Sequence, residues 1–316
     1  MLCGMELKFS SDSLVMSQHN QIERSVLKYF PSAVGLARTL VPAKYNTTDR
    51  TSSLDKCALR KEDEKEISDG VPYLSMVALV LYYACMTFPQ LAFTAAFLGR
   101  FMSDPNEACI DSAVMLVACL YHNRTDRLVY TKGASVPSVI SAAGYAASVA
   151  NNFGIYVTSD ASWKIRSTNE MNMTYAGHII FMCGAALDWS AKLLRVICFS
   201  SAESEIGAGC FGGKRAQFLR HFLIEAKKLG FGIGVSGPFV YLIDNKACGP
   251  LTTNEGVSKK TEHFLRWQHY LRWLVYHNLA VVIWISTKDM TSDVMTKCLD
   301  QTTFLKHKRV ALGTEI

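Results

Sequence analysis

Four carboxylates lie where a chain of alternating strands and helices would gather them. Asp160 and Asp244 each end an apolar run of residues. Glu205 falls in the first turn of an expected helix, and Asp293 lies where another helix begins. Strand ends and helix starts meet at one edge of an α/β sheet, which is where such sheets carry their sites. Four carboxylates in one cleft would repel one another unless cations lay between them.

The residue types point to divalent metal ions as those cations. Ligand sets that are rich in oxygen and poor in nitrogen suit Mg²⁺ or Mn²⁺. Two such ions about 4 Å apart can activate a water, hold a scissile phosphate and stabilise the leaving oxygen. We therefore expect Asp160, Glu205, Asp244 and Asp293 to be metal ligands and catalytic acids. For each acid taken alone, the ordinary alternative is a helix cap or a surface charge.

Glu203 competes with Glu205 for the place in the cleft. The apolar run Val196–Phe199 predicts a strand that ends at Ser200, and Ser200 and Ser201 can cap the helix that follows. Residues two apart are separated by about 200° around a helix, so the two glutamates point in opposite directions. One can face solvent and the other the sheet edge. Taken alone, this stretch favours two cap-region acids.

The elements around these acids alternate in a recognisable order. The first strands are expected at 154–160, 175–183 and within 188–199, and they precede a helix at 201–229 that stops at Gly230. A strand at 238–244, a helix at 258–278, a strand at 280–285 and a helix from about Thr291 follow. The order βββαβαβα predicts an α/β fold in which a mixed five-stranded sheet is flanked by helices.

The first half of the chain reads as strands and helices joined by linkers. Residues 1–42 hold a strand, a second apolar stretch and a helix at 19–30, and residues 43–70 form a charged linker. Residues 71–135 are mainly helical, and a Ser- and Ala-rich linker at 136–152 precedes the domain at 153–316. Tyr73–Phe88 carries no charge, but its 16 residues are fewer than the roughly 20 that a membrane span needs. A buried helix pair broken at Pro89 is the better interpretation.

Composition favours a globular protein, and the first residues lack the basic and then apolar segment of a secretion signal. The chain of 316 residues is 49% apolar and 19% charged, and its net charge of +6 is compatible with a polyanionic partner. Its ten cysteines form no Cys-x-x-Cys pair, which argues against a zinc site. Cys85, Cys183 and Cys198 lie in apolar runs, so we expect buried, reduced thiols in an intracellular protein, cytoplasmic or nuclear.

Six short motifs, in order and at matching spacing, resemble segments of copia-type LTR retrotransposon polyproteins. The segment at 200–205 resembles that family's Ser-Ser-Thr-Glu-Ala-Glu, and the gapless alignment makes Glu205 rather than Glu203 its second acid. The other five motifs lie at 159–163, 188–192, 243–247, 260–263 and 292–297. Residues 1–30 also resemble the family's Leu-Gly-Met-Glu-Ile strand and Leu-Ser-Gln helix, which close its reverse transcriptase.

The resemblance implies an RNase H-like domain at 153–316, preceded by a reverse transcriptase remnant at 1–42 and a connection region at 71–135. It implies a metal-dependent endonuclease that cuts the RNA strand of RNA–DNA hybrids with two Mg²⁺ or Mn²⁺ ions. Asp160 would bridge both ions, Glu205 and Asp244 would bind on the first-metal side, and Asp293 would bind the ion on the nucleophile side. Polymerase activity is not expected, because the sequence contains no Tyr-x-Asp-Asp.

The hybrid would be gripped through its backbone, because such duplexes are recognised by shape, phosphate and 2′-OH. Candidate contacts are basic side chains on two helices: Lys214, Arg215, Arg220, Lys227, Lys228, Lys259, Lys260 and Arg266. His263 shares a helix face with Trp267, and we expect it to be a packed core residue rather than a proton shuttle.

A second hypothesis stays open. The family's Ser-Thr-Ser-Gly-Tyr turn is changed at 172–177, and the polymerase core, protease and integrase are missing. The chain would then be a non-catalytic, decayed or domesticated fragment that at most binds nucleic acid. In either case the rest of the polyprotein is the expected partner if the chain is part of one, and a membrane protein is a distant third hypothesis.

Overall fold

The computed structural model describes residues 4–39, 54–61, 72–147, 155–163, 174–231, 237–245 and 265–314. Two compact units divide the chain. The first unit combines residues 1–129 with residues 297–316, and the second unit holds residues 130–296. The domain expected at 153–316 therefore differs from the second unit at both ends, because residues 297–316 group with the first unit.

The first unit is mainly helical. Its elements are β1 (Glu6–Phe9), β2 (Ser13–Ser17), α1 (His19–Tyr29), α2 (Pro31–Thr39), α4 (Tyr73–Met86), η1 (Pro89–Leu91), α5 (Ala92–Leu98), η2 (Gly99–Phe101), α6 (Glu107–His122) and α12 (Gln301–Leu312), with β3 (Leu128–Thr131) at the border between the units. Strands β1, β2 and β3 form a three-stranded sheet in that order.

The apolar residues of this unit are buried between its helices. Helix α4 contacts α5 and α6, and Val77, Val80, Leu98 and Leu116 are completely or almost completely buried. Within the described ranges, no helix combines the length and the hydropathy that crossing a bilayer requires. Helix α12 contacts η1 in this unit, and its Lys308 donates to Asp126 at 2.7 Å.

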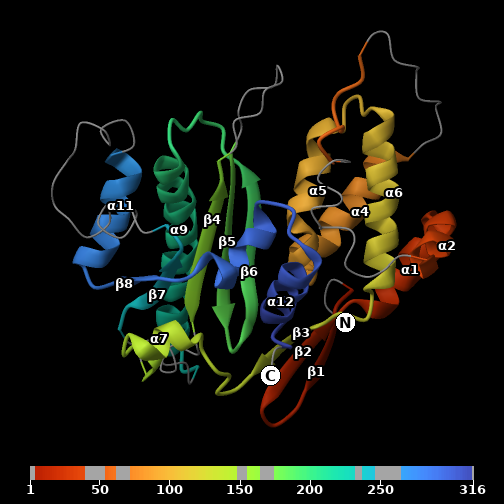
Figure 1. Cartoon of the computed structure of the whole chain (residues 1–316). Helices are drawn as coiled ribbons and strands as arrows, with labels where there is room; N and C mark the ends of the chain where they lie inside the picture. Colours follow the sequence, from red (N-terminus) through yellow and green to blue (C-terminus); the bar gives the residue numbers. More distant parts are fainter. Residues whose placement is uncertain are drawn as a thin grey trace. The chain divides into compact units, whose positions relative to one another are not determined.

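The second unit is built on a five-stranded mixed sheet (Figure 1). Its strands are β4 (Tyr156–Ser162), β5 (Tyr175–Met182), β6 (Ala185–Leu193), β7 (Phe239–Ile243) and β8 (Ala280–Trp284), and its other elements are α7 (Ser138–Ala142), α9 (Ser201–Lys228), α11 (Leu265–Tyr276), η4 (Thr287–Asp289) and η5 (Thr291–Met295). The strand order is β6-β5-β4-β7-β8. The pairs β4–β5 and β5–β6 are antiparallel, whereas β4–β7 and β7–β8 are parallel.

This topology confirms the expected RNase H-like fold: three antiparallel strands come first, followed by helix, strand, helix and strand. Helices α9 and α11 pack together on the sheet (Figure 1). Their contact encloses a core that contains Val157, Ile180, Ile206 and Leu271. Two glycines let α9 approach closely, because a Cβ on Gly212 would lie 2.9 Å from the Tyr241 hydroxyl and one on Gly209 3.4 Å from it.

The strand predicted at Val196–Phe199 was wrong. Strand β6 ends at Leu193, which already pairs with Tyr175, the first residue of β5. The described part of β5 therefore offers no backbone for residues 196–199 to pair with, and Ile197 and Phe199 are exposed. Residues 138–142, expected to be part of a linker, form the short helix α7.

The expected linker and the expected burial of the cysteines agree only in part with the structure. The expected charged linker at 43–70 is described only over 54–61, where Leu54 and Cys57 are buried. The cysteines in the described ranges are free thiols, as expected, but Cys85 is exposed rather than buried, and Cys183 is half-buried.

We expect Ile180→Ala to lower the free energy of unfolding of the second unit by about 2–5 kcal/mol, because it empties space in a fully buried core. The control is Ile197→Ala, at a position that is 56% exposed, where the change is expected to stay within about 0.5 kcal/mol. Urea denaturation followed by tryptophan fluorescence measures both. Equal losses in the two variants would contradict the core described above.

Candidate metal centre

Three of the four predicted acids converge in the second unit. One carboxylate oxygen from each of Asp160, Asp244 and Asp293 lies within 4.8 Å of the others. Asp160 is 2% exposed and Asp293 is 3% exposed, while Asp244 is half-buried. Three negative groups this close, two of them taken out of water, form a site suited to a cation.

Parallel pairing of β4 with β7 brings the first two acids together. In this register Tyr156 pairs with Val240 and Thr158 with Leu242. The same offset of 84 residues places Asp160 beside Asp244, directly after the end of β7. The backbone of Asp244 is held in turn by Trp284, whose indole N–H donates to the Asp244 carbonyl at 2.9 Å.

Asp293 is delivered by the short helix η5, which packs on β4 and β5. The close approach needs a glycine in β5: a Cβ on Gly177 would lie 2.4 Å from the Cβ of Met295 and 2.9 Å from Cγ2 of Thr296. Gly177 is also the partner of Asp160 in the β4–β5 register. The glycine thus lets η5 settle beside Asp160, within reach of the metal centre.

Thr296 completes the link between η5 and β4. Its side chain is buried, and its hydroxyl donates a hydrogen bond to Oδ2 of Asp160. The same hydroxyl lies 3.3 Å from the carbonyl oxygen of Asp293. The sequence indicated neither role for Thr296 and Gly177, although a glycine inside a strand is a known sign of close backbone approach.

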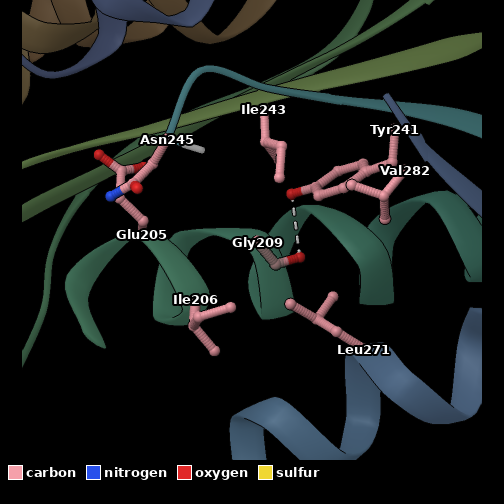
Figure 2. A pocket seen from close by; sticks show the side chains of 8 residues that line it. All are labelled: Glu205, Ile206, Gly209, Tyr241, Ile243, Asn245, Leu271 and Val282. Carbon is pink, nitrogen blue, oxygen red and sulfur yellow. Dashed lines mark hydrogen bonds between the residues drawn. The ribbon is translucent and has the colours of Figure 1, made fainter. Parts of the chain in front are cut away.

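Glu205 lies outside the group of three. It is half-buried in the first turns of α9 and lines a small cavity together with Asn245, which directly follows Asp244. Figure 2 shows its side chain rising from the helix toward Asn245. Tyr241 and Gly209 line the same cavity, and the Tyr241 hydroxyl donates to the Gly209 carbonyl at 3.0 Å (Figure 2).

Glu203 has a different environment. It is 5% exposed, and its Oε2 accepts a hydrogen bond of 2.6 Å from the backbone N–H of Phe199. The Ser200 hydroxyl in turn accepts from the backbone N–H of Glu203 at 3.1 Å. These reciprocal bonds cap the start of α9, which gives Glu203 a structural task.

The basic candidates for nucleic-acid contact are only partly described. Lys259 and Lys260, like His263, lie outside the described residues. Lys214 is exposed and lies over the ring of Tyr270, 5.6 Å from its centroid, and Arg220 is half-buried. Lys227, Lys228 and Arg266 are exposed.

Arg215 belongs to a local cluster on the sheet. Its guanidinium binds both carboxylate oxygens of Asp188, at 2.6 and 3.0 Å, and His178 lies 3.2 Å from the same carboxylate. Burial raises the pKa of Asp188, but the hydrogen bonds and charges of His178 and Arg215 outweigh it and hold the pKa well below its usual value. Arg215 is therefore engaged within the fold.

The donor set of the centre fits a hard divalent cation. All three close ligand atoms are carboxylate oxygens, the ligands that Mg²⁺ and Mn²⁺ prefer. A cation would also offset the mutual repulsion of the three carboxylates, two of which, Asp160 and Asp293, are buried. The fold and this buried group are consistent with divalent metal binding.

The chain is similar to Pol polyproteins of plant transposons. It is 25% identical to the retrovirus-related Pol polyprotein of transposon TNT 1-94 from Nicotiana tabacum, over 96% of this chain and 21% of that protein. It is 24% identical to the corresponding polyprotein of transposon RE1 from Arabidopsis thaliana, over 85% of this chain and 16% of that one. The chain thus spans about a fifth or less of these relatives, and no protein-family model matches it.

Among solved structures, the chain is similar to the N-terminal RNase H domain of a Mycobacterium tuberculosis protein, fused to maltose binding protein. The likeness covers 50% of this chain and 97% of that one, with 14% identity and a TM-score of 0.31. A likeness this weak defines no function.

The variant Gly177→Ala tests the packing of η5 against β5. The added methyl group would overlap Met295 and Thr296, so we expect a loss of about 1–3 kcal/mol in unfolding free energy and weaker binding of Mn²⁺ to the displaced acids. Calorimetric titration with Mn²⁺ and urea denaturation measure the two effects. Gly35→Ala is the control, because a Cβ there meets nothing within 4 Å. Unchanged Mn²⁺ binding in Gly177→Ala would contradict this account.

Proposed function

We propose that this chain is a metal-dependent endonuclease that hydrolyses the RNA strand of RNA–DNA hybrids. The observation that carries the proposal is the approach of three carboxylates within 4.8 Å in an RNase H-like fold. The sequence similarity to part of two transposon Pol polyproteins also supports the proposal. The sequence lacks Tyr-x-Asp-Asp, so polymerase activity is not part of the proposal.

Asp160 is the central residue of the proposed mechanism. It lies beside Asp244 in the parallel register, and the group it forms with Asp244 and Asp293 fits metal ions. Two ions held there would activate a water and neutralise charge on the scissile phosphate and the leaving 3′ oxygen. The Thr296 hydroxyl fixes the orientation of the Asp160 carboxylate through Oδ2. Burial of Asp160 and Asp293 keeps bulk water away from their carboxylates.

Glu205 is proposed as the fourth ligand, on the side of Asp244. Its side chain rises toward Asn245, the neighbour of Asp244 (Figure 2). Because Glu205 lies outside the close group of three, we propose that it approaches the other acids when metal and substrate bind. Glu203 takes no part, because its carboxylate caps the start of α9.

The proposed substrate is a hybrid duplex, which proteins recognise by its shape, its phosphates and the 2′-OH of its RNA strand. The basic residues Lys214, Arg220, Lys259 and Lys260 remain proposed contacts, while Arg215 is the weakest of the set because it already binds Asp188. We propose that the chain acts in the cytoplasm or nucleus. If the chain is part of a polyprotein, the rest of that polyprotein is its proposed partner.

The first test is cleavage of a labelled RNA–DNA hybrid with Mg²⁺ or Mn²⁺. We expect cleavage of the RNA strand alone, abolished by EDTA and slowed about a thousandfold or more in Asp160→Asn, because the variant loses a central ligand charge. Asp12→Asn, in an exposed turn, is the matched control and should cleave at the normal rate. Folded protein that cleaves with neither metal would overturn the proposal in favour of a non-catalytic fragment that at most binds nucleic acid.

The two glutamates of α9 give a second, paired test. Glu205→Gln should reduce cleavage about tenfold or more while the unfolding free energy stays within about 0.5 kcal/mol, because its side chain is only half-buried. Glu203→Ala should instead lower the unfolding free energy by about 0.5–2 kcal/mol, because it removes a cap. Stability curves and single-turnover cleavage rates separate these outcomes. The opposite pattern would transfer the ligand role to Glu203.

A further inference from the structure

Helix α9 carries an apolar stripe on the face that points away from the sheet. Phe211 is 42% exposed, Phe218 63%, Phe222 60% and Leu229 78%. At about 100° per residue, these four side chains lie within roughly 20° of one line along the helix. The buried positions Ala216 and Leu223 lie on the other side, against the core of the sheet. The stripe is therefore a second apolar surface that the fold of the described residues does not use.

The spacing of this stripe is that of a helix–helix seam. Steps of four and three residues alternate along it, as at the a and d positions of a heptad repeat. Two charged residues, of opposite sign, fill the positions between the apolar ones. The six seam positions are Phe211, Arg215, Phe218, Phe222, Glu225 and Leu229.

The seam is complementary to itself when one copy is reversed. Each pair of seam positions is centred on residue 220, so an antiparallel partner would place Phe211 opposite Leu229 and Phe218 opposite Phe222. The remaining pair is Arg215 opposite Glu225, which carry opposite charges. Six layers then match, with apolar groups facing apolar groups and a cation facing an anion. We propose that two copies of this chain associate through α9 as an antiparallel helix pair with two-fold symmetry.

Charge selects this orientation over the parallel one. A parallel pair aligns each position with itself, so Arg215 would face Arg215 and Glu225 would face Glu225, which is unfavourable. The antiparallel pair places both charges in attractive contacts, repeated twice by the symmetry. Each copy offers the same patch, as a closed two-fold dimer requires.

The charges are available to a partner. Asp188 engages the Nε and Nη2 atoms of Arg215, and a guanidinium has five N–H donors, so further donors can face the second copy. Glu225 is bound to Lys228 at 2.7 Å, but both side chains are about two-thirds exposed, and an exposed pair of this kind holds weakly. Exchange of Lys228 for the partner's Arg215 therefore costs little.

The size of the seam sets the expected affinity. With typical aromatic side-chain areas, the exposed parts of the three phenylalanines and Leu229 amount to roughly 400 Å² per copy. A dimer built on twice this area, roughly 800 Å², is smaller than standard specific interfaces and falls among weak, transient ones, so we expect a dissociation constant of the order of 1–100 μM. The pair should form at high concentration and separate on dilution.

Sedimentation velocity of the full chain, from about 1 to about 300 μM, tests the proposal. We expect a reversible shift from monomer to dimer. Phe218→Ser with Phe222→Ser should abolish the shift, whereas Phe231→Ser should leave it unchanged. Phe231 is the matched control because it is 61% exposed but follows the end of α9, off the seam.

Charge-reversal variants of Arg215 and Glu225 test the antiparallel orientation. Glu225→Arg would place an arginine opposite the partner's Arg215, and we expect it to weaken the dimer about tenfold or more. An equal mixture of Glu225→Arg with Arg215→Glu should restore association, because both cross-pairs are again attractive. Circular dichroism of each variant verifies that α9 remains folded, which matters for Arg215→Glu because it also loses Asp188.

Three results would overturn the proposal. The first is a chain that stays monomeric across the whole range. The second is a dimer that the two serine substitutions or Glu225→Arg leave intact. The third is a monomer whose affinity for a labelled hybrid falls on substitution of Phe218 and Phe222, which would assign the stripe to nucleic acid instead. None of these outcomes depends on cleavage activity, so failure here is distinct from failure of the proposed nuclease.

Discussion

Close packing at Gly177 determines whether the acids of the second unit can meet. The glycine lies opposite Asp160 in the β4–β5 register, and it leaves the space that Met295 and Thr296 occupy. With any larger residue there, η5 would be held off the sheet and Asp293 with it. Two glycines of α9 likewise let that helix approach the sheet, because Gly212 and Gly209 leave room for the Tyr241 hydroxyl. Close packing against these glycines thus sets the distances on which the electrostatics depend.

The electrostatic cost of the centre then explains its supports. Three carboxylates within 4.8 Å destabilise the folded state unless a cation is present, and dense packing is needed to hold them together. The Thr296 hydroxyl and the Trp284 indole each fix one element of the group, through the Asp160 side chain and the Asp244 backbone. Such pre-ordering of acidic ligands favours metal binding, because little conformational freedom remains to be lost.

The sequence predicted the fold and the neighbourhood of the acids from signals that are local. Strand ends at Asp160 and Asp244 follow from apolar runs, and parallel register alone then brings the two together. Asp293 could be placed by its motif, but the glycine that admits it acts across 118 residues, from Gly177 to Met295, and no local pattern encodes that contact. The prediction of a strand at 196–199 was wrong for the same reason. An apolar run forms a strand only beside a partner strand, and the described part of β5 begins at Tyr175, which already pairs with Leu193.

The division of the chain into its two units has a consequence for the order of folding during synthesis. The first unit needs residues 297–316, so it cannot be complete until those residues have left the ribosome. By then all of residues 130–296, including every predicted ligand of the metal centre, have already emerged. Domains usually fold from the N-terminus onward as they appear, but here the inner unit can close first. Until α12 arrives, the part of the first unit around η1 that it contacts stays exposed to chaperones and to aggregation.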